Sequence, residues 1–188
     1  MAASAIAAED GLRAVTIRDV AARAGMSTGL VLFHFQSKDQ LLLELLDWAL
    51  ATTTALRVGP AFLAIESPQE RFIALLKQEM TRIAAEPSVT RVFFEFWTEG
   101  LHDPDIRSRM KPELDRYRSA FQPIAAEMIG AQPERFGDVS PDALAAVAVS
   151  MIKGSAIQSL IEPSLDLDQY LAAAERLLRG KVEDGVTG

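Results

Sequence analysis

The segment from residue 16 to residue 46, TIRDVAARAGMSTGLVLFHFQSKDQLLLELL, constrains the fold most, because it gathers several helix-start and helix-stop signals in a short stretch. Thr16 followed by Asp19 has the form of a capping box, which closes the first turn of a helix. Gly25 stops this helix, since glycine enters the left-handed conformation without steric cost. Ser27 and Ser37 are placed to cap two further helices. The spacing predicts three helices joined by tight turns.

Apolar spacing predicts how the first two of these helices pack. One face of the first helix carries residues at positions i, i+3, i+4 and i+7, namely Ile17, Val20, Ala21 and Ala24. Val31 and Phe35 lie four residues apart on the second helix and are expected to pack on the small side chains of that face. The N-terminal residues of the second helix then point outward. A helix-turn-helix protein offers this end of its recognition helix to the major groove of DNA.

The segment resembles the N-terminal pattern of the TetR family of bacterial transcriptional regulators, T-x-x-D/E-I-A-x-x-A-G-V-S-x-G-x-x-Y-x-H-F-x-x-K-x-x-L. The matching positions are Thr16, Asp19, Val20, Ala21, Ala24, Gly25, Met26, Ser27, Gly29, His34, Phe35, Lys38 and Leu41. The chain departs from the pattern at Leu32, where a tyrosine that reaches phosphate is usual, and at Thr28, where lysine often follows the serine. Only residues 2–10 precede Gly11, so the first helix of the family is expected to be shortened here.

Two kinds of DNA contact are expected in this reader. Hydroxyl, imidazole and ammonium groups suit phosphate oxygens, which assigns that role to Thr16, Ser27, His34 and Lys38. Base edges would be read from the two helices, mostly by small or apolar contacts, by Arg18, Thr28, Gly29, Leu30 and Phe33. The alternative for Leu30, Leu32 and Phe33 is packing inside the reader. The formal charge of −7 argues against indiscriminate nucleic-acid binding, but a dimeric reader needs positive charge only at its docking face.

The rest of the sequence predicts helices without competing strand patterns. Ser37 and Gln40 open a long helix that is expected to run from about Lys38 to Arg57. Later helices are expected to start where a serine or an acid precedes Pro68, Pro87, Pro104 and Pro141, and to end near Gly100, Gly130 and Gly180. The predicted fold is all-α, with a three-helix reader over residues 1–46 and a helical effector-binding and dimerisation bundle over residues 47–188.

The densest aromatic cluster lies in RVFFEFWTEG, residues 91–100, which with MIKGSAIQSLIEP near Met151 resembles the ligand-binding half of BetI-like TetR regulators. The resemblance implies a site for a small-molecule effector, mainly apolar or cationic, with carboxylates as orienting groups. The candidate effector-binding residues are Trp48, Phe93, Glu95, Phe96, Trp97, Glu99, Tyr117 and Phe121. The alternative is that the aromatic residues form ordinary core and that the acids lie on a solvated helix face.

Two apolar helix faces near the C-terminus predict a homodimer. They carry Leu144, Val147, Met151, Leu171 and Leu178, and two such helices from each of two chains would form a four-helix interface, as in the family. The alternative is that both faces are buried within one subunit.

Composition bounds the remaining functions. The chain has no cysteine and two histidines, so disulfides, thiolate metal sites and catalytic triads are poorly supplied, and we expect no enzyme activity, metal or cofactor. No apolar run approaches the roughly 18 residues of a membrane span, and no signal peptide is evident, so a cytoplasmic protein is expected.

Together these features predict a dimeric regulator, most simply a repressor, that binds a palindromic operator in double-stranded DNA and responds to a small effector. The alternatives are a helical enzyme or small-molecule-binding protein without DNA activity, and a dimeric scaffold with a degenerate reader. Detectable turnover without DNA would favour the enzyme, whereas salt-sensitive binding to a palindrome would favour the regulator.

Overall fold

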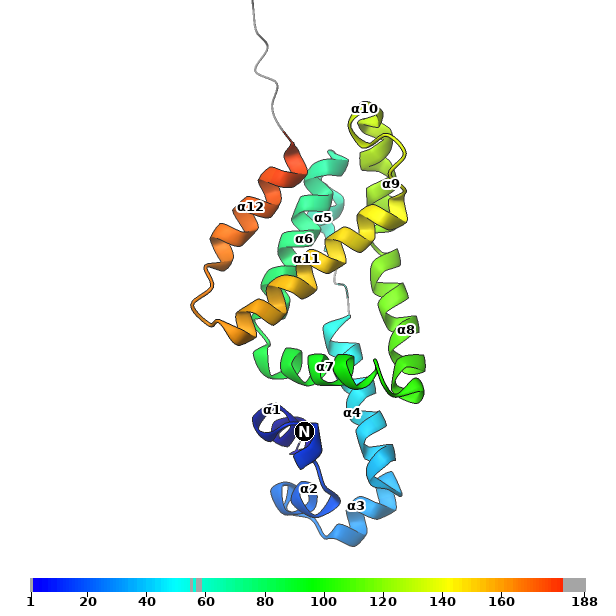
Figure 1. The fold of residues 1–188 in the computed structure, drawn as a ribbon, viewed down its shortest axis with the longest axis vertical. Helices are drawn as coiled ribbons and strands as arrows, with labels where there is room; N and C mark the ends of the chain where they lie inside the picture. Colours follow the sequence, from blue (N-terminus) through cyan, green and yellow to red (C-terminus); the bar gives the residue numbers. More distant parts are fainter. Residues whose placement is uncertain (1, 55, 57–58, 181–188) are drawn as a thin grey trace, which may run out of the picture. The chain divides into compact units, whose positions relative to one another are not determined.

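The computed structural model describes residues 2–54, 56 and 59–180, and these form helices and connecting turns without any strand (Figure 1). The reader elements are α1 (Ala2–Asp10), the 3-10 turn η1 (Leu12–Ala14), α2 (Ile17–Ala24), α3 (Thr28–Phe35) and α4 (Lys38–Thr53). They are followed by α5 (Pro60–Leu63), α6 (Pro68–Ala84), α7 (Pro87–Glu99), α8 (Pro104–Ser119), α9 (Gln122–Ala131), α10 (Pro133–Phe136), α11 (Pro141–Ile161) and α12 (Leu167–Arg179). The predicted all-α class is confirmed.

Proline starts six of the described helices, and four of these starts were predicted. Helices α6, α7, α8 and α11 each begin at the proline that the sequence indicated. Proline suits the first helical position because its fixed φ is helical and its missing N–H would have no partner there. Gly100 and Gly180 follow the ends of α7 and α12, whereas Gly130 lies inside α9, one residue before its end.

Helix α4 is shorter than predicted. It ends at Thr53, and the predicted end at Arg57 lies outside the described residues. Three successive threonine hydroxyls at this end donate to the carbonyl oxygens four residues earlier, at 2.9 Å from Thr52, 2.7 Å from Thr53 and 2.7 Å from Thr54. β-Branched residues with hydroxyls that bond the backbone weaken a helix, and the leucine-rich periodicity gave no sign of this.

The chain divides into two compact units. The first comprises residues 1–55 and 83–117, so α7 and most of α8 belong with the reader helices. The second comprises residues 56–82 and 118–188. The predicted boundary at residue 46 therefore falls within α4, and the division of roles that it expressed stays a prediction.

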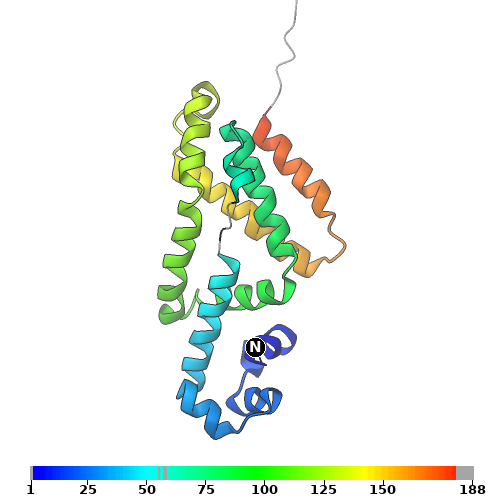
Figure 2. The ribbon, with the colours of Figure 1, turned by 180° about the vertical axis from the view of Figure 1, so that it is seen from behind.

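The first unit has an apolar core between α1, α4 and α7, with α2 and α3 attached at one side. Figures 1 and 2 both draw α1 between α2 and α7, and contacts join α1 to each of them and α4 to α7. Its buried members include Ile6, Leu45, Leu46, Val92 and Phe96. This core fixes the reader on the aromatic helix α7.

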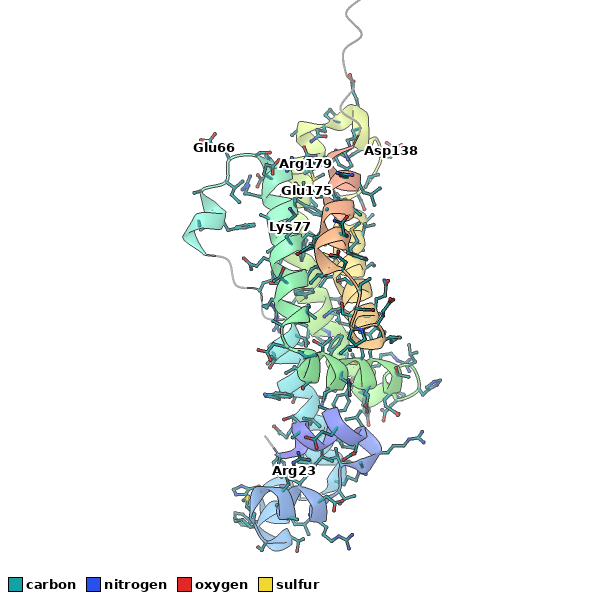
Figure 3. The ribbon with its side chains drawn as sticks, turned by 90° about the vertical axis from the view of Figure 1, so that its left-hand side faces the viewer. Arg23, Glu66, Lys77, Asp138, Glu175 and Arg179 are labelled. Atoms are coloured by element: carbon teal, nitrogen blue, oxygen red, sulfur yellow. The ribbon has the colours of Figure 1, made fainter. Side chains whose placement is uncertain are left out.

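The second unit is built around α6, which has α12 on one side and α9 on the other in both views (Figures 1 and 2). The rings of Phe72 and Phe121 meet edge to face at 5.9 Å. Helix α12 is attached to α6 by ion pairs of Lys77 with Glu175 and of Arg179 with Glu70, and Arg179 also pairs with Glu175 within α12 at 2.7 Å (Figure 3). These side chains are partly exposed, so their pairs lie at the surface of the unit.

Helix α11 corrects one expectation from the sequence. Its 21 residues include an 18-residue window of mean hydropathy 1.6, which makes it long and apolar enough to cross a membrane by length and composition alone. Scattered polar residues hide this in a search for an unbroken apolar run. In the structure α11 packs on α9 and α12, and core helices of soluble proteins pass the same test.

Candidate nucleic-acid interface

Three side-chain caps fix the helices of the reader. The Thr16 hydroxyl accepts a hydrogen bond from the Asp19 amide, the Ser27 hydroxyl from the Leu30 amide and the Ser37 hydroxyl from the Gln40 amide, each at 3.1 Å. Gly25 has φ 66° and ψ 29°, the left-handed conformation predicted for it. Because each cap is worth about 1 kcal/mol, the turn between α2 and α3 is rigidly defined.

Apolar packing then decides which face of α3 is covered. Val31 is buried against the face of α2 that contains the buried Val20 and Ala21, as predicted. Ala24 is exposed instead of packing against α3, because it lies in the last turn of α2 beside Gly25. Phe35 is partly buried at the margin of the core.

The opposite face of α3 is exposed and unusually apolar. Thr28 and Gly29 are exposed at its start, Leu30 is 43% exposed and Phe33 is 79% exposed. Leu32 is exposed as well, so the alternative of reader-core packing is wrong for these leucines and for Phe33. A rigid helix that presents a phenylalanine to solvent has the character of a contact surface.

The predicted phosphate-binding residues all lie on the reader, but they differ in exposure and in the hydrogen bonds they already make. His34 and Arg18 are exposed, and Lys38 is partly exposed with its ammonium 3.5 Å from the carbonyl oxygen of Arg13. The Thr16 hydroxyl both accepts from the Asp19 amide and donates to the Asp19 carboxylate at 2.5 Å. Both hydrogen-bonding functions of the Thr16 hydroxyl are therefore used within the helix cap. The Ser27 hydroxyl accepts in its cap and can still donate its proton to a phosphate oxygen.

Basic residues are concentrated in the middle of the reader, although residues 1–46 as a whole contain five acids and four bases. Between residues 13 and 38 the bases are Arg13, Arg18, Arg23 and Lys38, and the single acid is Asp19. Arg23 is engaged in a bidentate ion pair with Glu9 of α1, at 2.6 and 2.7 Å, which lowers the pKa of the Glu9 carboxyl (Figure 3). The charge available to a polyanion is that of Arg13, Arg18 and Lys38.

The predicted effector-binding residues lie in different settings within the described part of the chain. Phe93 and Phe96 are buried in the core of the first unit, and Trp48 and Trp97 are partly buried around it. Glu95 accepts a hydrogen bond from the Leu12 amide at 2.6 Å, and Glu99 is exposed. Tyr117 is buried in the first unit, whereas Phe121 is buried in the second. These placements give Phe93, Phe96 and Glu95 structural roles, so their effector roles remain unsupported predictions.

The predicted dimer residues fall into two groups. Leu144 and Leu178 are buried within the second unit, which corrects their assignment to a free surface. Val147 is 50% exposed, and Met151 and Leu171 are partly buried. Ile161, at 79% exposure, was not predicted; it lies ten residues after Met151 and fourteen after Val147, which places all three on one face of α11.

Buried charged groups inside the second unit were also not predicted from the sequence. Glu79 is fully buried and pairs with Arg82 at 2.6 Å. Lys153 of α11 is buried nearby, and burial followed by the charge of Arg82 lowers the pKa of its ammonium to about 7, against a smaller opposing effect of Glu79. Within the described residues, no three His, Cys, Asp or Glu side chains are grouped to hold a metal ion.

Comparison with known proteins relates both parts of the chain to regulators. Residues 1–45 match the family model described as bacterial regulatory proteins, tetR family, and residues 68–182 match that of the BetI-type transcriptional repressor, C-terminal. The HTH-type transcriptional regulator BetI 1 of Chromohalobacter salexigens is 31% identical over 110 residues, 57% of this chain and 52% of that protein. The matched region thus spans about half the length of this curated relative.

Solved structures share the fold across nearly the whole chain. One is a transcriptional regulator from Saccharomonospora viridis in complex with choline, with a TM-score of 0.70 and 22% identity over 96% of this chain and 93% of that one. Another is AibR in complex with isovaleryl coenzyme A and operator DNA, with a TM-score of 0.67 and 16% identity over 93% and 92% of the two chains.

Proposed function

Because this chain belongs to the TetR family of bacterial regulatory proteins, with a BetI-type C-terminal part, we propose that it is a homodimeric DNA-binding repressor of transcription. The observation that carries the proposal is the exposed face of α3. Thr28, Gly29, Leu30 and Phe33 lie on a helix that is capped at its start and held by Val31, so this face enters the major groove without reordering. A chromosomal operator places the protein in the cytoplasm.

The chemistry of this face favours apolar base readout. Leu30 and Phe33 offer carbon surface to thymine methyl groups, while Thr28 and Arg18 can donate hydrogen bonds to base acceptors. Lys38, His34 and Ser27 contact phosphate and set the register. The repressor therefore selects an operator whose half-sites contain thymine at the positions that Phe33 approaches.

Dimerisation supplies the second reader. We place the interface on α11 and α12, where Val147, Met151 and Ile161 form an apolar stripe and Leu171 and Leu177 extend it. Two readers fit successive major grooves when their recognition helices are roughly 34–36 Å apart, which requires a palindromic operator. An effector that favours another separation of the readers weakens operator binding by its difference in affinity between the two states.

A small-molecule effector is supported by the neighbours of this fold, of which one is in complex with choline and another with isovaleryl coenzyme A. These ligands differ in charge and size, so the fold alone does not define effector chemistry. For this chain the effector belongs to the helical part that follows the reader.

The test is selection of bound sequences from random double-stranded DNA. We expect a palindrome, and binding to it should weaken with salt. Phe33→Ala should lower operator affinity at least tenfold while melting as the parent does, and Lys38→Ala should reduce the slope of log affinity against log salt by about one phosphate contact. Asp39→Ala, an exposed neighbour of Lys38, is the control. Recovery of no enriched sequence by a folded dimer would overturn the proposal.

A further inference from the structure

A groove within the first unit lies beside the reader's first helix and shares only Trp48 with the predicted effector-binding residues. It has a volume of about 530 Å³ and is formed by α1, by Trp48 of α4 and by the beginning of α7. Ala5, Ala8 and Val89 give it apolar walls, and Glu9 and Arg91 are its charged residues. Its volume is in the range of sites that hold small molecules.

Trp48 gives this groove an aromatic wall. The side chain is partly buried against the core of the unit and also lines the groove, so packing holds the indole in place. A fixed indole is a stacking surface for a planar ring and loses little conformational entropy on binding. The groove therefore suits a flat, largely apolar molecule better than a flexible chain.

The charges at the groove favour an anion. The Glu9 carboxylate is held by both terminal nitrogens of Arg23, which compensates its charge. Arg91 donates from Nη1 to the carbonyl oxygen of Ala8 at 3.1 Å, and this neutral partner leaves the guanidinium charge uncompensated. Guanidinium pairs with carboxylate more strongly than with a backbone carbonyl, since both partners are then charged.

We propose that this groove binds a planar, largely apolar small molecule with one carboxylate, whose ring lies against Trp48 and whose carboxylate pairs with Arg91. The site shares Trp48 with the predicted effector cluster, whereas Phe96 of that cluster is buried in the core and does not line the groove.

Binding has a structural consequence in the same unit. The bond from Arg91 to Ala8 joins α7 to the last turns of α1, and α1 in turn contacts α2. A carboxylate that engages Arg91 competes with this bond and loosens the attachment of α1. The regulatory meaning of this change rests on the proposed function, because only a DNA-binding reader would report it.

Binding is measured first without DNA, by calorimetry with 2-naphthoate, its neutral amide 2-naphthamide and the cation 2-naphthylmethylammonium. In the Trp97→Phe protein Trp48 is the sole tryptophan, so its fluorescence reports whether the ring is beside it. We expect saturable quenching and a Kd for 2-naphthoate at least tenfold lower than for the amide. Equal affinities for the three probes, tighter binding of the cation or no binding at all would each overturn the proposal.

Variants locate the site. Ala5→Phe should fill the groove and abolish binding, and Arg91→Gln should remove the preference for the anion while Arg91→Lys keeps part of it. Arg107→Gln is the matched control, because Arg107 also donates to backbone carbonyls in this unit, those of Gly100 and Leu101, away from the groove. Each variant is compared with the parent by melting temperature. Binding of 2-naphthoate that survives Ala5→Phe in a folded protein would place the ligand elsewhere.

Operator affinity with and without 2-naphthoate is then measured separately. If the protein binds the probe but no operator, the proposed function is refuted and the groove assignment stands. If it binds an operator but not the probe, the groove assignment is refuted and the proposed function stands.

Discussion

Helices α7 and α11 both bury apolar residues but differ in their other side chains. In α7 the large side chains of Phe93 and Phe96 are buried while Arg91 and Glu99 face solvent, as expected for a helix that supports a core. In α11 a lysine is buried, while Val147 and Ile161 are exposed. A buried lysine and exposed apolar side chains both lower the stability of a lone subunit, and a role in binding a partner or a ligand would account for them. The burial of each residue therefore distinguishes core-forming helix faces from contact surfaces more clearly than the hydrophobicity of the sequence does.

The largest effect on subunit stability is expected at α7. Phe96→Ala removes a ring that is 1% exposed in the core of the first unit, which should lower the free energy of unfolding by about 3–5 kcal/mol. Chemical denaturation measures it, and Phe94→Ala at the partly buried neighbouring position should cost less. An alanine variant at residue 96 with parental stability would show that α7 is not the scaffold of this comparison.

Replacing the buried lysine of α11 should raise the free energy of unfolding, in contrast to Phe96→Ala. Lys153→Met removes an ammonium whose pKa is lowered to about 7 by burial and by Arg82. We expect a gain of about 2 kcal/mol at neutral pH, less than the roughly 5 kcal/mol of a full shift, because the interior relaxes around the charge.

The pH dependence of this gain distinguishes it from simple packing. Since the folded-state pKa of Lys153 is lowered, the unfolded chain binds more protons between pH 7 and about 10.5, so the parent gains stability as the pH rises through this window. The advantage of Lys153→Met should be constant well below pH 7 and should fall as the pH rises from 7 toward 10.5. Lys111→Met, which removes a lysine at an exposed position, is the control. A pH-independent difference between Lys153→Met and the parent would exclude the titration.

The outer face of α11 should give the smallest effect on the subunit itself. Val147→Glu places a charge at a half-exposed position, so the monomer should change in stability by no more than about 0.5 kcal/mol. In a dimer interface the same charge must be desolvated, and sedimentation should show monomers. Leu101→Glu, at another exposed apolar position, should stay dimeric. If Val147→Glu also stays dimeric, the exposed stripe has another role.

Local signals predicted the reader well. Thr16, Ser27 and Ser37 cap their helices because capping depends on residues three positions apart, and Gly25 turns the chain because its conformation is set locally. The backbone conformation of the turn after α3 was not predicted, since Gln36 has a φ of 61° that neither its residue type nor the spacing indicates.

Tertiary contacts explain what the sequence did not predict. Leu144 and Val147 are equally apolar, and only the helices packed around α11 decide that one is buried and the other exposed. In the same way, the periodicity of α7 predicted apolar faces. It did not predict that the Glu95 carboxylate accepts a hydrogen bond from the Leu12 amide. The sequence did not indicate which of the aromatic residues of the effector prediction would be buried in the core, because that depends on the helices packed around them.

The ion pairs between α6 and α12 make salt a perturbant of the body as well as of DNA contacts. Lys77, Glu175, Arg179 and Glu70 lie at the surface, where the Debye length falls from about 10 Å at 0.1 M to about 3 Å at 1 M salt. Rising ionic strength therefore loosens α12, one of the two helices assigned to the dimer, while it screens phosphate. In the proposed operator-binding dimer, these two effects add in the same direction, so operator affinity should fall with ionic strength more steeply than the few phosphate contacts alone would dictate.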